Sequence, residues 1–133
     1  MKEEEKEKLL LKDLSSRLPY GVMIHLGETN EIEELYCLNI SQEALYTRNK
    51  EHKSVSSLCP IGQCKPYLRS MSSMTEEERK KYHDIDNKAY SCPEDYAHIP
   101  AKDRIDWLNA NHFDYRGLIG KGLALEVDKD FYK

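Results

Sequence analysis

The sequence predicts a single α+β domain over residues 1–133, with an amino-terminal helix, a small antiparallel β-sheet, and short carboxy-terminal helices that lead to a closing strand. Three observations predict this class. Leucines near the start recur at helical spacing, apolar and polar residues alternate in the next third, and helix-capping residues recur in the last third. A chain of 133 residues has the size of one domain.

The first helix is predicted over residues 3–18. Most of its acidic residues lie early in the helix, where they suit the helix dipole. Pro19 ends it because the residue before a proline is pushed out of the helical region. The apolar side chains share one face, which we expect to pack on the core: Leu10, Leu11, Leu14 and Leu18.

The sheet is predicted to begin as a hairpin of residues 20–26 and 32–40, joined by the turn sequence GETNE. In the second strand the alternation places Tyr36, Leu38 and Ile40 on one face. The segments ALYTRN (44–49) and KSVSSL (53–58) can extend the hairpin into a three- or four-stranded meander.

Capping signals organise the rest of the chain. In TEEE, Thr75 and Glu78 form a capping box that starts a short helix over 76–83, and residues 84–100 read as an irregular loop. Asp103 is predicted to cap a helix that carries Trp107, which we expect to anchor this helix on the sheet. Asp114 is predicted to cap another over 115–121, before a closing strand with alternating Leu123, Leu125 and Val127.

Composition predicts an intracellular, cytoplasmic protein without membrane spans. No apolar run approaches the length of a transmembrane helix, and the start MKEEEKEK lacks the apolar core of an export signal. The four cysteines are therefore expected to be reduced thiols.

The stretch CPIGQC raises the question of a metal site. Cys59 and Cys64 have four residues between them, a looser spacing than most zinc pairs. A second pair would have to come from Cys92 and His98, or from His83. Pro60 and Gly62 explain the stretch more simply as a turn, so we expect neither a metal nor another cofactor.

The sequence contains none of the common catalytic signatures: GxSxG, GxxxxGK[ST], HExxH and GxGxxG are all absent. Many cysteine and histidine pairs could be drawn, but none is singled out. This favours a non-enzymatic function, and a small enzyme with an unfamiliar site remains an alternative.

Binding residues are sought among the aromatic and basic side chains. Nine tyrosines and one tryptophan accompany a modest apolar content, and such rings serve either as core or as recognition surface. Residues 44–83 carry eight bases and four acids within a chain of net charge −4, which predicts weak nucleic-acid binding at most. The candidate binding residues are Tyr36, Tyr46, Arg48, Lys50, Lys53 and Trp107.

Three blocks carry a resemblance: KDLSSRLPYGVMIHL (12–26), KPYLRSMSSMTEEERKKYH (65–83) and DWLNANHFDYRGLIGKGLALEV (106–127). In these blocks the chain resembles a family of small proteins from gut-bacterial phages, prophages and their hosts. The resemblance implies a mobile-element setting, and it brings no catalytic or ligand residues with it.

The leading hypothesis is a non-enzymatic interaction module of phage or mobile-element origin that binds a protein partner. One alternative is a small metal- or nucleic-acid-binding regulator, which would use the Cys59/Cys64 turn or the basic segment. The other alternative is a small enzyme whose site matches none of the common signatures.

Overall fold

A computed structural model describes residues 2–27, 31–49, 51, 55–91 and 98–132 and confirms the α+β class. Three short 3₁₀ turns, η1 (Leu18–Tyr20), η2 (Ile61–Gln63) and η3 (Met71–Ser73), connect the elements. The helices are α1 (Glu3–Arg17), α2 (Glu76–Ser91) and α3 (His98–Ala110). The strands are β1 (Met23–Leu26), β2 (Ile32–Asn39), β3 (Ala44–Arg48), β4 (Val55–Pro60), β5 (Cys64–Ser70), β6 (Phe113–Asp114) and β7 (Leu125–Glu126).

The sheet has the order β4-β3-β2-β1-β5-β6, and the pairs from β4 to β5 are antiparallel. The two-residue strands β6 and β7 both pair parallel with β5. Strand β5 follows β4 in the chain, yet it pairs with β1 at the other side of the meander. The sheet therefore coils around its own core, and the turn η2 connects the edge strand β4 to β5.

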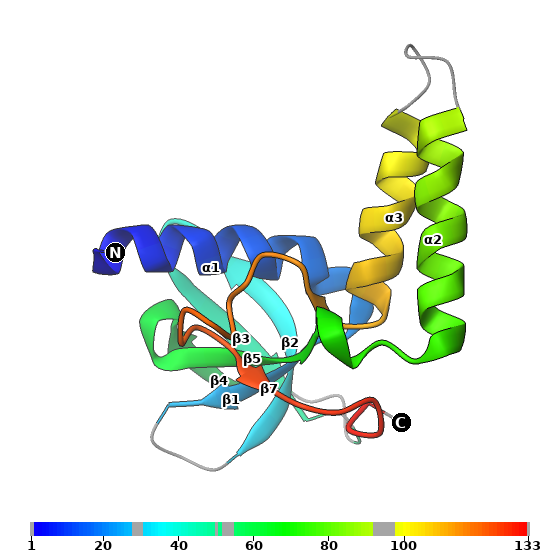
Figure 1. The fold of residues 1–133 in the computed structure, drawn as a ribbon. Coiled ribbons are helices and arrows are strands. Elements are labelled where there is room, and N and C mark those ends of the chain that lie inside the picture. The colour runs from blue at the N-terminus through cyan, green and yellow to red at the C-terminus, as the bar shows by residue number, and fades with distance from the viewer. Residues whose placement is uncertain (1, 28–30, 50, 52–54, 92–97, 133) are drawn as a thin grey trace.

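The predicted amino-terminal helix is confirmed as α1, which lies across one side of the coiled sheet (Figure 1). Leu10 and Leu14 are buried in the main core, as the leucine spacing predicts. This core gathers apolar side chains from α1, from strands β1 to β5 and from the carboxy-terminal segment around Leu118.

A β-bulge changes the faces of β2. The pairing with β3 shifts between Leu35 and Cys37, so two residues of β2 occupy a place where regular pairing has one. The prediction that Tyr36, Leu38 and Ile40 share a face is therefore wrong. Leu38 packs against the core, while Tyr36 is 47% and Ile40 is 70% exposed.

Helices α2 and α3 stand side by side as a hairpin next to the coiled sheet (Figure 1). The capping box is confirmed, because the Thr75 N–H donates to Glu78 Oε1 (2.9 Å) and the Glu78 N–H donates to Thr75 Oγ1 (3.2 Å). The predicted loop over 84–100 is wrong at both of its ends, because α2 continues to Ser91 and α3 begins at His98, while residues 92–97 lie outside the described residues. This stretch has few apolar residues, and contacts between the two helices stabilise its helical form. One of these contacts is the Arg104–Asp86 ion pair at 2.8 Å. Asp103, the predicted helix cap, lies inside α3.

Trp107 belongs to a second, smaller cluster and not to the sheet core. Its ring stacks on Phe113 at 5.6 Å between centroids and lies 6.1 Å from the ring of Tyr82 on α2. Trp107 therefore contacts the sheet as expected, but only at its edge strand β6, through Phe113, and it also joins α3 to α2 through Tyr82.

The segment after β6 forms turns where a helix over 115–121 is predicted. Asp114 still acts as a cap, since its carboxylate accepts the N–H groups of Leu118 (2.8 Å) and Ile119 (2.9 Å). The closing strand is confirmed only as the short β7. Within the described residues, no helix combines the length and apolar character that a membrane crossing requires.

Candidate functional site

The surface of β2, β3 and β4 that faces away from the core carries a row of paired side chains. Tyr46 on β3 lies opposite Cys37 on β2 and opposite Leu58 on β4. Paired residues of antiparallel strands point to the same side. Leu45 and Thr47, the neighbours of Tyr46, are fully buried, so Tyr46 and its partners point outward.

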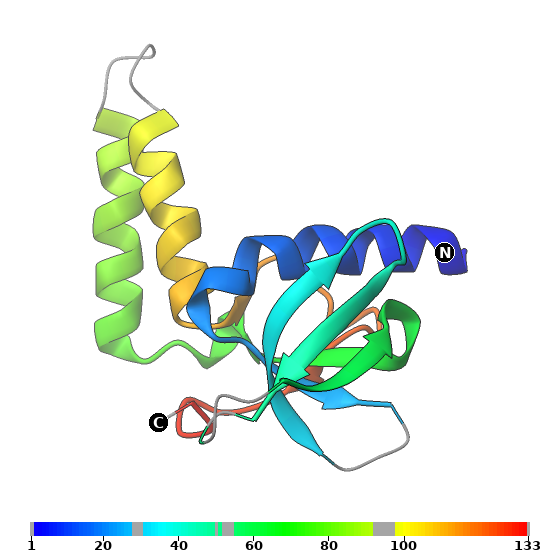
Figure 2. The same cartoon turned by 180° about the vertical axis from the view of Figure 1, so that it is seen from behind.

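Tyr36 and Arg48 complete this surface, because the Arg48 guanidinium lies 5.2 Å from the centroid of the Tyr36 ring. Arg48 Nη2 also lies 3.1 Å from Glu34 Oε1. We call the surface formed by five residues the outer face: Tyr36, Cys37, Tyr46, Arg48 and Leu58. In Figure 2, β2 and β3 lie in front of α1, so this side of the two strands is turned toward the viewer.

Exposed large apolar side chains concentrate around the outer face. Four such residues occur in the described part of the chain: Ile32 (47% exposed), Tyr36 (47%), Ile40 (70%) and Leu58 (54%). Ile32, Tyr36 and Leu58 lie on β2 or β4, and Ile40 lies in the turn that follows β2. Tyr36 and Leu58 belong to the outer face, and exposed apolar side chains that share a face are typical of an interaction surface.

Strand β4 adds an open backbone edge to this surface. It is the terminal strand of the sheet order, and no other strand in the described ranges pairs with its free side. An edge strand presents N–H and C=O groups that can pair with a strand from another chain. The outer face and this edge are therefore continuous at Leu58.

The structure brings together three of the six predicted binding residues: Tyr36, Tyr46 and Arg48. Lys50 and Lys53 lie outside the described residues, and Trp107 is half-buried between α2 and α3. The sequence reasoning missed Leu58, and the signal that could have found it is the β3–β4 pairing, which places it opposite Tyr46.

The cysteine turn differs from its prediction in one respect. CPIGQC does form a turn, η2, but the structure joins Cys59 and Cys64 in a disulfide, so the expectation of reduced thiols is wrong for this pair. The corner between β4 and β5 brings both sulfurs to the core side. Cys92 and the side chain of His98 lie outside the described residues. Within the described residues, no three His, Cys, Asp or Glu side chains gather closely enough to hold a metal ion.

A second candidate is the cleft of about 750 Å³ between the start of α2, the end of α3 and the carboxy-terminal segment. Two of its charged groups are bonded to each other: Arg69 Nη1 and Nη2 each donate to the Glu78 carboxylate at 2.8 Å. These bonds lower the pKa of Glu78 to about 2, which makes it a poor proton acceptor at neutral pH.

Tyr132, in the same cleft, is engaged in a similar way. Its hydroxyl accepts the Met23 N–H (3.0 Å) and donates to the Tyr67 carbonyl (2.6 Å), and burial raises the pKa of Tyr132. Glu78 and Tyr132 thus join elements of the fold, and we take the outer face as the better candidate for function.

Comparison of the chain with protein-family models, with curated proteins and with solved structures finds no match.

Proposed function

We propose that this protein is a non-enzymatic interaction module that binds an extended segment of a partner protein on the outer face. The observation that carries the proposal is the exposure of two large apolar side chains of the outer face, Tyr36 (47%) and Leu58 (54%), with Ile32 exposed on the same strand as Tyr36. A surface that buries such side chains on binding gains hydrophobic free energy without rearrangement of the core.

The open edge of β4 indicates how the partner binds. A partner strand that pairs with β4 gains main-chain hydrogen bonds, and every second side chain of that strand lies on the same side as Leu58. We expect apolar or aromatic residues at these positions, where they contact Leu58 and, across β4, the ring of Tyr46. The neighbouring Tyr36–Arg48 stack gives the surface a fixed shape beside the strand.

The resemblance to phage and prophage proteins makes a phage or host protein the partner class that we propose, with a cytoplasmic setting. The proposal does not involve a cofactor. Tight nucleic-acid binding is not part of it, because the net charge of the chain is −4.

Selection from a random peptide display library tests the proposal even though the partner is unidentified. Enriched peptides are measured against the wild type, Leu58→Glu and the control Asn87→Glu, which adds the same charge on exposed α2. We expect peptides with alternating apolar residues that bind the wild type and the control but not Leu58→Glu. Amide chemical shifts should change on β3 and β4.

Equal binding to Leu58→Glu, or shifts confined to other elements, would contradict the proposal. Sedimentation of the free protein provides a further check. A dimer that Leu58→Glu dissociates would show that a second copy of the chain, and not a separate partner, covers the outer face.

A further inference from the structure

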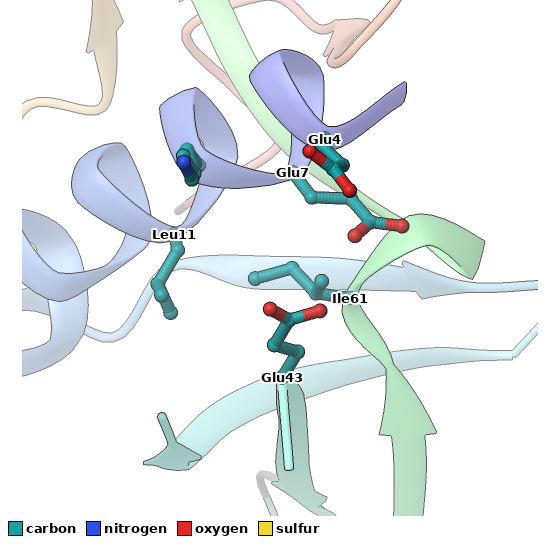
Figure 3. Close-up of a pocket in the computed structure, with 6 residues that line it drawn as sticks. Glu4, Glu7, Leu11, Glu43 and Ile61 are labelled. Carbon is teal, nitrogen blue, oxygen red and sulfur yellow. The ribbon is translucent and has the colours of Figure 1, made fainter. Parts of the chain in front are cut away.

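A groove of about 300 Å³ separates the first half of α1 from the turn η2 (Figure 3). Its apolar floor consists of Leu11 on α1 and the buried Ile61 of η2. Figure 3 shows the carboxylates of Glu7 and Glu43 directed toward Ile61 from opposite sides, with Glu4 next to Glu7. The groove thus combines an apolar floor with an acidic rim.

Tertiary contacts bring Glu7 and Glu43 to opposite sides of the groove. Glu7 lies against Gly62, where a Cβ atom would come within 2.8 Å of Glu7 Oε1, so a larger residue at position 62 would displace it. Glu43, just before β3, is tied to η2 by the hydrogen bond from the Ile61 N–H to the Glu43 carbonyl (3.0 Å). The rim therefore belongs to the fold of three separate segments.

The charge of the groove points to the kind of group that fills it. Three glutamates and one lysine, Lys8, line it, and none of the three glutamates forms an ion pair among the residues that the structure describes. Carboxylates that face one another across an apolar floor favour a cation between them. A bare metal ion prefers oxygen ligands on all sides, which Leu11 and Ile61 do not provide.

We propose that this groove binds an arginine or lysine side chain from a basic segment of a partner protein. The aliphatic stem lies on Leu11 and Ile61, and the charged head lies between Glu7 and Glu43, so the apolar and acidic parts of the groove are both used. The volume lies at the lower end for ligand pockets and suits one long side chain. This inference does not depend on the outer face.

The test measures binding of a fluorescein-labelled peptide of repeated Arg-Gly-Ser units at low salt. The matched probe replaces each arginine by citrulline, which keeps the shape and removes the charge. The protein variants are Glu7→Gln and Glu43→Gln, with Glu126→Gln on β7 as a control for net charge and Leu58→Glu as a control for the outer face. Circular dichroism checks that each variant is folded.

We expect the arginine peptide to bind and the citrulline peptide not to bind. Each of Glu7→Gln and Glu43→Gln should weaken binding by about two- to fivefold, the size of a partly exposed ion pair. Glu126→Gln should leave the affinity unchanged, and amide shifts should centre on Leu11 and Ile61.

An equal loss for Glu126→Gln would show attraction to net charge alone and would overturn the inference, as would equal binding of the citrulline peptide. If only Leu58→Glu fails to bind the arginine peptide, the binding belongs to the outer face instead. The two proposals can therefore fail separately.

Discussion

Arg17 and Asp13 form a fully buried ion pair one turn apart on α1, with Nε to Oδ2 at 2.7 Å and both side chains 0% exposed. Arg17 Nη2 also donates to the Phe113 carbonyl (2.7 Å), and Asp13 accepts a bond from Arg116 Nε (3.2 Å). The pair therefore connects the first helix to the segment that follows α3, two regions that lie about one hundred residues apart in the chain.

Removal of Asp13 should destabilise the protein more than removal of Arg17. Asp13→Ala leaves a buried guanidinium without a counterion, a loss of about 3–5 kcal/mol in the free energy of unfolding. Arg17→Met leaves Asp13 paired with Arg116, so we expect a smaller loss. Urea denaturation of both variants measures the difference, and an equal or reversed order would contradict the prediction.

Tyr132 joins β1 to β5 through its hydroxyl, which bonds to Met23 and Tyr67. Tyr132→Phe leaves the Met23 N–H and the Tyr67 carbonyl without this partner, at an expected cost of about 1–3 kcal/mol in unfolding free energy. Tyr36→Phe, on the exposed outer face, is the matched control and should unfold like the wild type. Urea denaturation measures the loss. Equal unfolding midpoints for the wild type and Tyr132→Phe would show that water replaces the hydroxyl.

Glu78 should make the stability depend on acid pH. Its pKa is lowered from 4.5 to about 2, chiefly by its hydrogen bonds with Arg69. A lowered pKa in the folded state contributes stability above the unfolded pKa, and this contribution is lost as pH falls from 4.5 toward 2. Glu78→Gln should therefore cost about 2–3 kcal/mol at neutral pH and progressively less in this window.

The measurement is urea unfolding of wild type and Glu78→Gln at a series of pH values. Glu77→Gln, an exposed neighbour in the same first turn, serves as the control and should follow the wild type. A Glu78→Gln deficit that stays constant down to pH 2 would contradict the assigned role of the carboxylate.

Trp107→Ala should lower the local stability of the α2–α3 hairpin more than that of the sheet. The ring contacts Tyr82 and Phe113 in the smaller cluster, so we expect a loss of about 3 kcal/mol, at the low end for tryptophan because the ring is half-buried. Amide hydrogen exchange should rise in α2 and α3 while β1 and β2 stay protected. Uniform loss of protection would show that the two clusters unfold as one unit.

The sequence alone determined the elements that show a local pattern: helical spacing, strand alternation or a capping box. The leucine spacing predicted α1, the alternation predicted the strands of the meander, and the reciprocal bonds of Thr75 and Glu78 follow directly from the capping box. The candidate site could be predicted in part for the same reason: Tyr36, Tyr46 and Arg48 stand on neighbouring strands of a predicted meander.

Tertiary structure alone decided what depends on partners far away in the chain. The bulge that turns Leu38 toward the core comes from pairing with β3, and the continuation of α2 to Ser91 comes from packing on α3. The groove exists only where α1 meets η2. Such features have no local signature, because their free energy comes from contacts between separate segments, whereas periodicity and capping report only on a residue's neighbours along the chain.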